Sequence, residues 1–458
     1  MLLGKVFERF VDLAPVCVAA RAVLEAALAP QALDDLFGRV AQRQYTRTLL
    51  FSTCVSLMAT VVCRVHRTVH AAYQASLGEI AVSLKSLYAK LEHLEPNLSA
   101  ELVRHTARQL ASVIGQMKGE LPPLLPGYRA RILDGNHLGG TQRRLKVLRN
   151  VAAGALPGQT LVVLDPQLGL AVDVVCCEDG HAQERSLLDP ILAQVAAEDL
   201  WIADRNFCTT GFLFGVAGPG GCFLIRQHAS TLHWTRESRR RRAGRTQTGT
   251  VYEQTLGLED GQGETLPVRR VTLVLDQPTR DGEKEINLLT NLPASAARAR
   301  RVAELYRERW TIEKLFQELT TILRCEVSTL AYPKAALFGF CVALASGNVY
   351  ATVKASLRAV HGVEEVEQQV SDHYLGAEIA GKYEGMMIAI PERHWRPLAT
   401  CGPKELAALL RRLAGNVRLE RFQKHPRGPK KSKPRRTHFA KAKHIATARL
   451  LAGQKRLE

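Results

Sequence analysis

The hydrophobic pattern of this chain changes at one proline-rich segment, Pro122–Gly127. Before it, apolar residues recur at helical spacing, as Leu84, Leu87 and Leu91 do. After it come short apolar runs bounded by glycine, proline and aspartate, first as a hairpin and then alternating with helical patterns. This order predicts an all-helical N-terminal part followed by a mixed sheet covered by helices.

Positive charge is concentrated near the C-terminal end. From Arg421 to Glu458 there are 13 Lys and Arg against one Glu, so +12 of the net +18 lies in this segment. A basic, proline-broken segment cannot build a core alone, and we expect an arm that neutralises nucleic-acid phosphates. Lys430 and Lys431 are its candidate DNA contacts, and the alternative is a solubilising tail.

The ten cysteines form no Cys-x-x-Cys pair, and Cys176 and Cys177 are adjacent, which is poor geometry for a disulfide. We expect reduced, mostly buried thiols and a cytoplasmic location. The longest apolar stretch, Leu49–Cys63, is shorter than a membrane span of about 20 residues. A buried helix is the expectation there.

Three acidic residues stand in settings that suit metal chemistry. Asp134 and Asp204 each end a short apolar run that reads as a buried strand, and Glu313 lies in a helical pattern over Ala296–Leu323. Mg²⁺ takes hard oxygen ligands, and two metals about 4 Å apart can clamp both oxygens of a phosphoryl displacement. Carboxylates of this kind in a basic chain predict cutting of a polyanion.

Tyr306, Arg309, Glu313 and Thr320 lie along one face of the expected helix. Arg309 precedes Glu313 by one turn and could orient it or hold a phosphate through paired hydrogen bonds. The alternative for Arg309 and Glu313 is a surface ion pair worth about 0.5 kcal/mol.

Several motifs together resemble the DDE transposases of the insertion-sequence-four family. They are the Tyr306, Arg309 and Glu313 spacing, the Asp134-Gly135-Asn136 start, the Ala203-Asp204-Arg205-Asn206-Phe207 box, and a β-rich insert before Glu313. The resemblance covers roughly residues 45 to 455. It implies a ribonuclease-H-like core in which Asp134, Asp204 and Glu313 are the catalytic residues and the ligands of Mg²⁺, with Mn²⁺ as a substitute.

The resemblance also implies function and partners. A DNA transposase would cut at the ends of a transposable element and join the freed 3′-hydroxyl to target DNA. Its partners would be double-stranded DNA, namely the terminal inverted repeats and the target, and a second copy of the chain in the DNA complex. No membrane is expected, and the location would be the bacterial cytoplasm at the nucleoid.

We therefore expect an α/β multidomain protein in five segments. They are an all-α N-terminal DNA-end-binding domain (1–125), the first part of a ribonuclease-H-like core (126–228), a β-rich insertion domain (229–293), the second part of the core with the glutamate helix (294–360), and a helical C-terminal region with the basic tail (361–458). For the first segment, a purely structural helical domain is the alternative. A further helix is expected over Ala182–Ala197.

Further DNA contacts are expected from basic and aromatic residues. The candidates are Tyr306, Arg309, Lys314, Arg205, Trp234, Arg239, Arg240 and Arg241. In the insert, an aromatic beside many guanidiniums can stack a base while neutralising phosphates. The resemblance implies that an insert tryptophan, here Trp234, holds a flipped base; the alternative is a basic surface loop.

Position 320 departs from the family pattern, which has lysine where this chain has Thr320. Lys314 or Arg324 could substitute for it, although Lys314 points about 100° away from Glu313 on a helix. Two alternatives to a transposase therefore stay open. One is a ribonuclease-H-like nuclease that cuts without joining, and the other is a decayed copy that only binds DNA.

Overall fold

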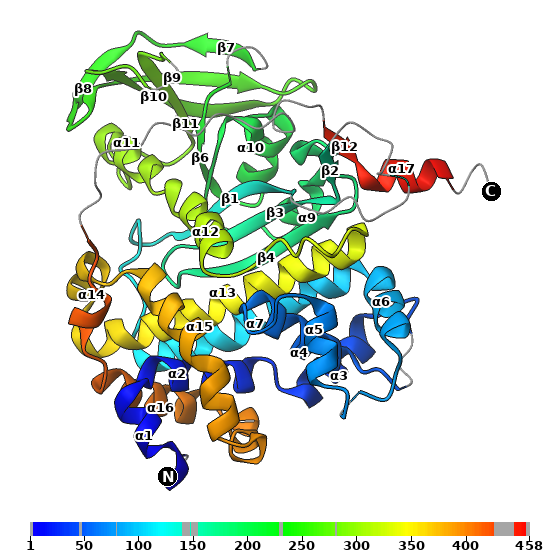
Figure 1. The fold of residues 1–458 in the computed structure, drawn as a ribbon. Helices are drawn as coiled ribbons and strands as arrows, with labels where there is room; N and C mark the ends of the chain where they lie inside the picture. The colour runs from blue at the N-terminus through cyan, green and yellow to red at the C-terminus, as the bar shows by residue number, and fades with distance from the viewer. Residues whose placement is uncertain are drawn as a thin grey trace.

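The computed structural model describes residues 3–44, 48–78, 80–139, 147, 154–228, 232–279, 282–425 and 444–454. One large mixed sheet lies against a layer of helices that come from both ends of the chain (Figure 1). The expected mixed α/β architecture, with a large mixed sheet and helical ends, is confirmed.

The N-terminal part is helical up to the proline-rich segment. Its α-helices are α1 (Glu8–Leu13), α2 (Pro15–Ala27), α3 (Pro30–Val40), α4 (Phe51–Val62), α5 (Val69–Ala75), α6 (Leu84–His93) and α7 (Pro96–Met117). Proline opens α2, α3 and α7, where its missing N–H leaves no bond unmade. Thr68 and Ser83 cap α5 and α6 by accepting a backbone N–H.

Ten of the described strands form the main sheet. In chain order they are β1 (Arg129–Leu138), β3 (Gly158–Asp165), β4 (Leu170–Cys177), β5 (Asp199–Ala203), β6 (Cys222–Arg226), β7 (His233–Glu237), β8 (Arg241–Thr246), β9 (Gly249–Glu259), β10 (Thr265–Leu275) and β11 (Glu285–Thr290). Their order in space is β4-β3-β1-β5-β6-β11-β10-β9-β7, with β8 also paired to β9. β1 is antiparallel to β3 and parallel to β5, which is parallel to β6.

The strands between residues 233 and 290 continue this sheet through the pairing of β11 with β6. The β-rich insert thus extends the core sheet edge to edge, and the five-segment division of the chain stays a prediction. A second, small sheet pairs β2 (Gly154–Leu156) with β12 (His444–Ala446). Together with α17 (Thr447–Gln454), this pairing holds the described end of the basic tail beside the core (Figure 1).

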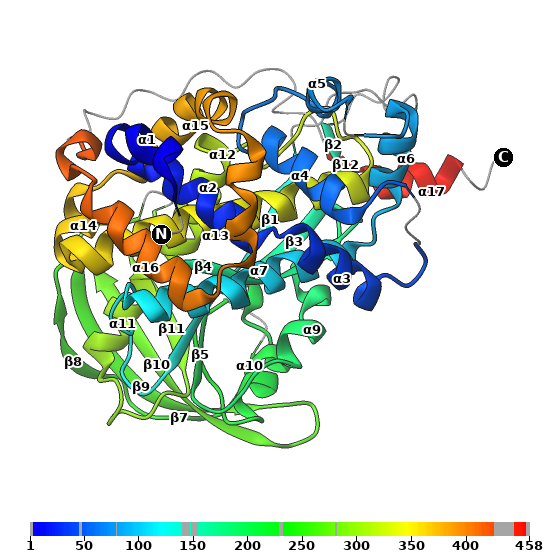
Figure 2. The same cartoon turned by 90° about the horizontal axis from the view of Figure 1, so that it is seen from below.

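The remaining α-helices cover the sheet or follow it in the chain. They are α9 (Asp189–Leu192), α10 (Thr210–Ala217), α11 (Ala299–Arg307), α12 (Trp310–Thr321), α13 (Pro333–His361), α14 (Val363–Gln369), α15 (Asp372–Ala389) and α16 (Pro403–Gly415). Buried residues of α2 share a core with Leu375, Trp395 and Leu410 of the C-terminal part. From below, α2 and α16 are seen to cross α13 (Figure 2).

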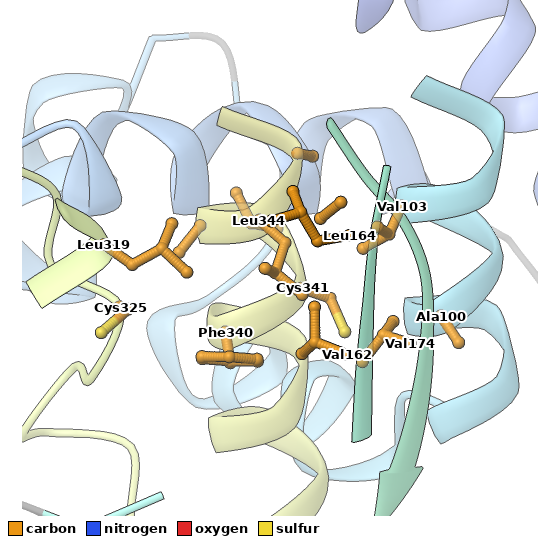
Figure 3. Close-up of a cluster of buried hydrophobic side chains, with 14 of the residues drawn as sticks. Ala100, Val103, Val162, Leu164, Val174, Leu319, Cys325, Phe340, Cys341 and Leu344 are labelled. Atoms are coloured by element: carbon orange, nitrogen blue, oxygen red, sulfur yellow. The ribbon is translucent and has the colours of Figure 1, made fainter. Parts of the chain in front are cut away.

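α13 is the central element of the hydrophobic core. Cys341 and Leu344 on this helix face buried side chains of β3 and β4, and Val103 of α7 joins the same cluster (Figure 3). By length and composition α13 could cross a membrane, but 83% of its apolar window is buried inside the protein. The helix therefore serves as the hub on which the sheet and the helical layer pack.

Two predicted helices are wrong in detail. Over Ala182–Ala197 the chain forms a short 3₁₀ turn at Glu184–Leu187 and then the four-residue α9. Pro190 explains the break, because it stands at the start of α9, lacks the N–H that would continue the preceding turn, and would clash with the carbonyl four residues earlier. The helix expected over Ala296–Leu323 is divided into α11 and α12.

The division between α11 and α12 is a tightened turn. The N–H of Glu308 donates to Leu305 O at 3.0 Å, and the N–H of Arg309 donates to Tyr306 O at 3.2 Å. Bonds of this i to i−3 type mark a local 3₁₀ segment. Tyr306 therefore lies in the last turn of α11, and Glu313 lies in the first turn of α12.

Candidate active site

Three neighbouring parallel strands bring polar residues to one edge of the sheet. Leu133 of β1 pairs with Ala203 of β5, and Ala203 pairs with Ile225 of β6. The next residue on each strand is Asp134, Asp204 and Arg226 respectively. We call these three residues the strand-end row. The two predicted aspartates are thus brought together, as their positions after apolar runs indicated.

Each aspartate is fixed by a backbone hydrogen bond. Asp204 adopts an extended conformation and caps the 3₁₀ turn Arg205–Phe207, its Oδ1 accepting Asn206 N–H at 2.7 Å. Asp134 Oδ1 accepts the N–H of Gly135 at 2.9 Å. These bonds leave other oxygens of both carboxylates for further ligands, because a carboxylate can accept about four hydrogen bonds.

Glu313 reaches the strand-end row through Arg309. Arg309 Nη1 lies 3.2 Å from Asp134 Oδ2, and its Nη2 lies 2.5 Å from Glu313 Oε1. The side chain of Arg309 is 11% exposed. The turn between α11 and α12 positions this guanidinium, which joins the sheet carboxylate to the helix carboxylate.

Glu184 is a fourth carboxylate at the site, and the sequence patterns did not single it out. Its Oε2 accepts Asn206 Nδ2–H at 3.3 Å, and its Oε1 lies over Gly135, 2.0 Å from where a Cβ at residue 135 would stand. Burial raises the pKa of Glu184, and the nearby Asp204 raises it further. Only a glycine at position 135 leaves room for this carboxylate, which is the one sequence signal that bears on it.

The carboxylates repel one another at close range. Burial, with repulsion from Asp204 and Glu184, raises the pKa of Asp134 to about 7, although Arg309 opposes the rise. Burial also raises the pKa of the Tyr306 hydroxyl to about 12, within reach of Asp204 and Arg309. The site thus concentrates acidic side chains around the guanidinium of Arg309, an arrangement typical of functional sites.

The donor set suits a hard divalent cation, although the groups are not yet arranged around one. Among the described residues, no three acidic, histidine or cysteine side chains lie close enough together to hold a metal ion. Arg309 stands between Asp134 and Glu313 and supplies the positive charge that these carboxylates attract. Oxygen donors, mutual repulsion and burial all fit Mg²⁺ or Mn²⁺, provided that Arg309 or Glu313 shifts.

Three of the residues predicted to contact DNA lie in different places relative to these carboxylates. Arg205 follows Asp204 directly and is exposed. Lys314 turns instead to α15, with its Nζ 2.8 Å from Asp372 Oδ2. Trp234 lies on β7 at the far edge of the sheet, half-buried, with Arg270 over its ring at 5.1 Å.

The basic residues of the insert lie apart from the carboxylates. Arg239, Arg240 and Arg241 are exposed, and Arg240 stacks on Tyr252 at 4.2 Å. Lys430 and Lys431 lie outside the described residues. These positions leave DNA contact by the insert and by the tail as predictions.

Thr320 and Trp310 complete the description of α12. The hydroxyl of Thr320 donates to Phe316 O at 2.9 Å within its own helix, and Arg324 donates to the carbonyl of His66 at 3.3 Å. Lys314 and Arg324 both have partners within the protein, and their substitution for a lysine at position 320 stays a prediction. Trp310, which sequence reasoning missed, is 63% exposed beside Arg309.

Comparison with known proteins bears on the segment that contains this site. Residues 127–344 match the family model described as the transposase DDE domain. The matched segment begins just before β1, ends within α13 and includes Asp134, Glu184, Asp204 and Glu313. No curated protein matches the chain. The transposase DDE domain match suggests transposase activity and a DNA substrate for the carboxylate site.

Proposed function

We propose that the protein is a DNA transposase that cuts at the ends of a transposable element and transfers the freed 3′-hydroxyl into target DNA. The observation that carries the proposal is the set of carboxylates around Asp134 and Asp204 within the segment that matches the transposase DDE domain. The net charge of +18 supports a polyanionic substrate.

In this proposal Asp134, Asp204 and Glu313 hold divalent metal, and Glu184 assists from the loop after β4. Mg²⁺ bound there would polarise a phosphoryl oxygen and lower the pKa of a bound water. Arg309 orients Glu313 and Asp134 in the metal-free protein, and Tyr306 closes the site beside Asp204. Burial raises the pKa of Asp134 to about 7, so this carboxylate gains or loses its proton near neutral pH.

We also propose that the core is ribonuclease-H-like. The supporting feature is the strand order β4-β3-β1-β5-β6, with β3 and β4 antiparallel neighbours of β1 and with β5 and β6 parallel to it. One acidic residue lies on the first strand and another directly after the fourth strand of this unit. That placement supports a ribonuclease-H-like core, which the strands of the insert extend through the pairing of β11 with β6.

Partners and location follow from the proposed reaction. Two element ends must be held together, so a homodimer on DNA is expected. Gel filtration of the protein with paired end duplexes tests this, and one protomer per paired complex would count against it. Action on chromosomal DNA places the protein in the bacterial cytoplasm at the nucleoid.

The test uses the DNA that flanks the coding region. Terminal inverted repeats found there supply labelled duplexes, which are incubated with Mg²⁺ or Mn²⁺ and either wild type or Asp204→Asn. We expect metal-dependent cutting and joining by wild type only, with a loss of at least ~10³-fold in the variant, because a metal contributes several kcal/mol to the transition state. DNA binding by both proteins without any cutting would contradict the proposal.

Two competing functions are separated by the same assay. Cutting without joined products would identify a nuclease, because the carboxylates serve both reactions and only the nucleophile differs. Retained DNA binding with no cutting would identify a decayed copy, and Thr320 is the feature that favours it. The presence of all four carboxylates favours an active enzyme.

A further inference from the structure

Arg226 occupies the third position of the strand-end row, next to Asp204 on the neighbouring strand. Its side chain is 24% exposed, and it lies within electrostatic reach of Tyr306. Arg205, directly after Asp204, has a side chain that is 55% exposed. Two guanidiniums thus lie at the side of the carboxylates that faces β6 and β11.

Both guanidiniums contact one carboxylate, that of Glu283. Arg226 Nη2 is hydrogen-bonded to Glu283 Oε2, and Arg205 Nη1 lies 3.5 Å from Glu283 Oε1. Glu283 precedes β11, and its own N–H donates to Thr279 Oγ1 at 3.1 Å. The hydrogen bond from Arg226 lowers the pKa of Glu283, which therefore remains a carboxylate.

A polar cavity of about 380 Å³ surrounds this contact, and Arg205, Arg226, His228 and Glu283 are among its lining residues. Nδ1 of His228 is buried, and no hydrogen-bond partner for it is found within the described part of the chain. The cavity thus combines two guanidiniums and an unsatisfied imidazole nitrogen beside Asp204. A carboxylate and a phosphate offer guanidiniums the same pair of oxygen acceptors.

We propose that Arg205 and Arg226 form a binding site for a backbone phosphate of DNA beside the carboxylates, and that Glu283 occupies this site in the DNA-free protein. The proposal rests on the proposed function in that the ligand is DNA. When a DNA strand enters, its phosphate replaces the Glu283 carboxylate on the two arginines. Only DNA that competes with Glu283 therefore reaches the carboxylates of the candidate active site. No covalent step is involved.

Binding of a labelled duplex of arbitrary sequence, in EDTA so that no cutting occurs, tests the proposal. We expect Glu283→Gln to bind about fivefold more tightly than wild type, because an intramolecular competitor is removed. Arg226→Gln should lower the slope of log affinity against log salt by about 0.9, the value for one phosphate contact. In a protein that already carries Arg205→Gln and Arg226→Gln, the further change Glu283→Gln should not increase affinity for the duplex.

Glu304→Gln is the matched control. Glu304 also has a side chain that is 34% exposed and lies near two arginines, Arg300 at 2.9 Å and Arg301 at 3.8 Å, on α11. Equal gains for Glu283→Gln and Glu304→Gln would show an effect of net charge alone and overturn the proposal. If Glu283→Gln fails to fold, Arg205→Gln alone must lower both affinity and salt slope; unchanged values would overturn it as well.

A final arm distinguishes DNA from free phosphate. Inorganic phosphate that raises the melting temperature of wild type but not of Arg226→Gln, with no change in DNA affinity between them, would assign the cavity to a free anion and overturn the proposal. Failure of wild type to bind any duplex would instead contradict the proposed function. If wild type cuts DNA while Glu283→Gln and Glu304→Gln gain equal DNA affinity, the proposed phosphate site is contradicted and the proposed function is not.

Discussion

The carboxylate of Glu184 lies directly over the backbone of Gly135, so that a Cβ at residue 135 would stand 2.0 Å from Glu184 Oε1. Because the obstructing atom is the end of a flexible side chain, Gly135→Ala should displace Glu184 rather than distort β1. We expect the fold to be kept and metal-dependent cutting to fall by about 10- to 100-fold, as for loss of a supporting group at a metal site. Single-turnover cutting against Mg²⁺ concentration measures this.

Gly139→Ala is the matched control, because no atom of the described residues lies within 4 Å of a Cβ at that position. Glu184→Gln should reproduce the effect of Gly135→Ala, and the double variant should be no worse than either, since both act on the same side chain. A full additive loss would show that Gly135 matters for another reason.

The raised pKa of Asp134 predicts that the stability of the protein depends on pH in metal-free buffer. Burial raises the pKa of its carboxyl to about 7, against about 3.9 in the unfolded chain. The folded protein thus binds the extra proton between these values, and this contribution to stability is lost as pH rises from about 4 to 7. The slope cannot exceed about 1.4 kcal/mol per pH unit for one proton.

Asp134→Asn removes this titrating group, so its free energy of unfolding relative to wild type should rise between about pH 4 and pH 7. Urea unfolding in EDTA measures the difference. Burial also raises the pKa of Glu318 to about 7, but that residue is present in both proteins and its effect cancels in the comparison. A difference that stays constant with pH would rule out the raised pKa of Asp134.

Asp372 of α15 stabilises the position of α12, the helix that carries Glu313. Its carboxylate lies 2.8 Å from Lys314 Nζ on α12 and 2.9 Å from Lys354 Nζ on α13. Asp372→Asn should cost about 2 kcal/mol of stability, because a hydrogen-bonded charge pair in a partly buried place loses one partner. It should also slow cutting, since Lys314 adjoins Glu313.

Urea unfolding and single-turnover cutting check the role of Asp372, with Glu384→Gln as an exposed acidic control on the same helix. If Lys314 instead contacts DNA directly, Asp372→Asn would free it and tighten DNA binding. That outcome would return Lys314 to the set of DNA contacts predicted from the sequence.

The sequence predicted the sheet edge better than it predicted the helices. Asp134 and Asp204 were found because each follows a buried apolar run, and the ends of parallel strands meet at one edge. The helix expected over residues 182–197 failed at Pro190, where a local steric effect overrides the periodic pattern. The 3₁₀ turn at Glu308 and Arg309 could not be predicted, because it contains no proline or glycine.

Glu184 and Arg226 could not be placed from the sequence. Each reaches the site through space, from a loop and from a strand whose register depends on the whole sheet. DNA contact by Lys314 stays a prediction, and only the tertiary structure shows that its side chain also pairs with Asp372 of α15. Local pattern thus predicted the two strand-end aspartates, and tertiary packing decides which charges surround them.

Arg309 provides the last prediction, because its guanidinium stands where a cation is needed between Asp134 and Glu313. In Arg309→Ala, two carboxylates lose their counter-charge, so metal-free stability should fall. Mg²⁺ should then stabilise the variant more than wild type, since no internal cation competes for the carboxylates and binding adds RT ln(1 + [Mg²⁺]/Kd). Melting temperature against Mg²⁺ concentration measures both effects, with Arg307→Ala as an exposed control on the preceding helix. An equal Mg²⁺ response in wild type and Arg309→Ala would show that the metal binds without displacing this arginine.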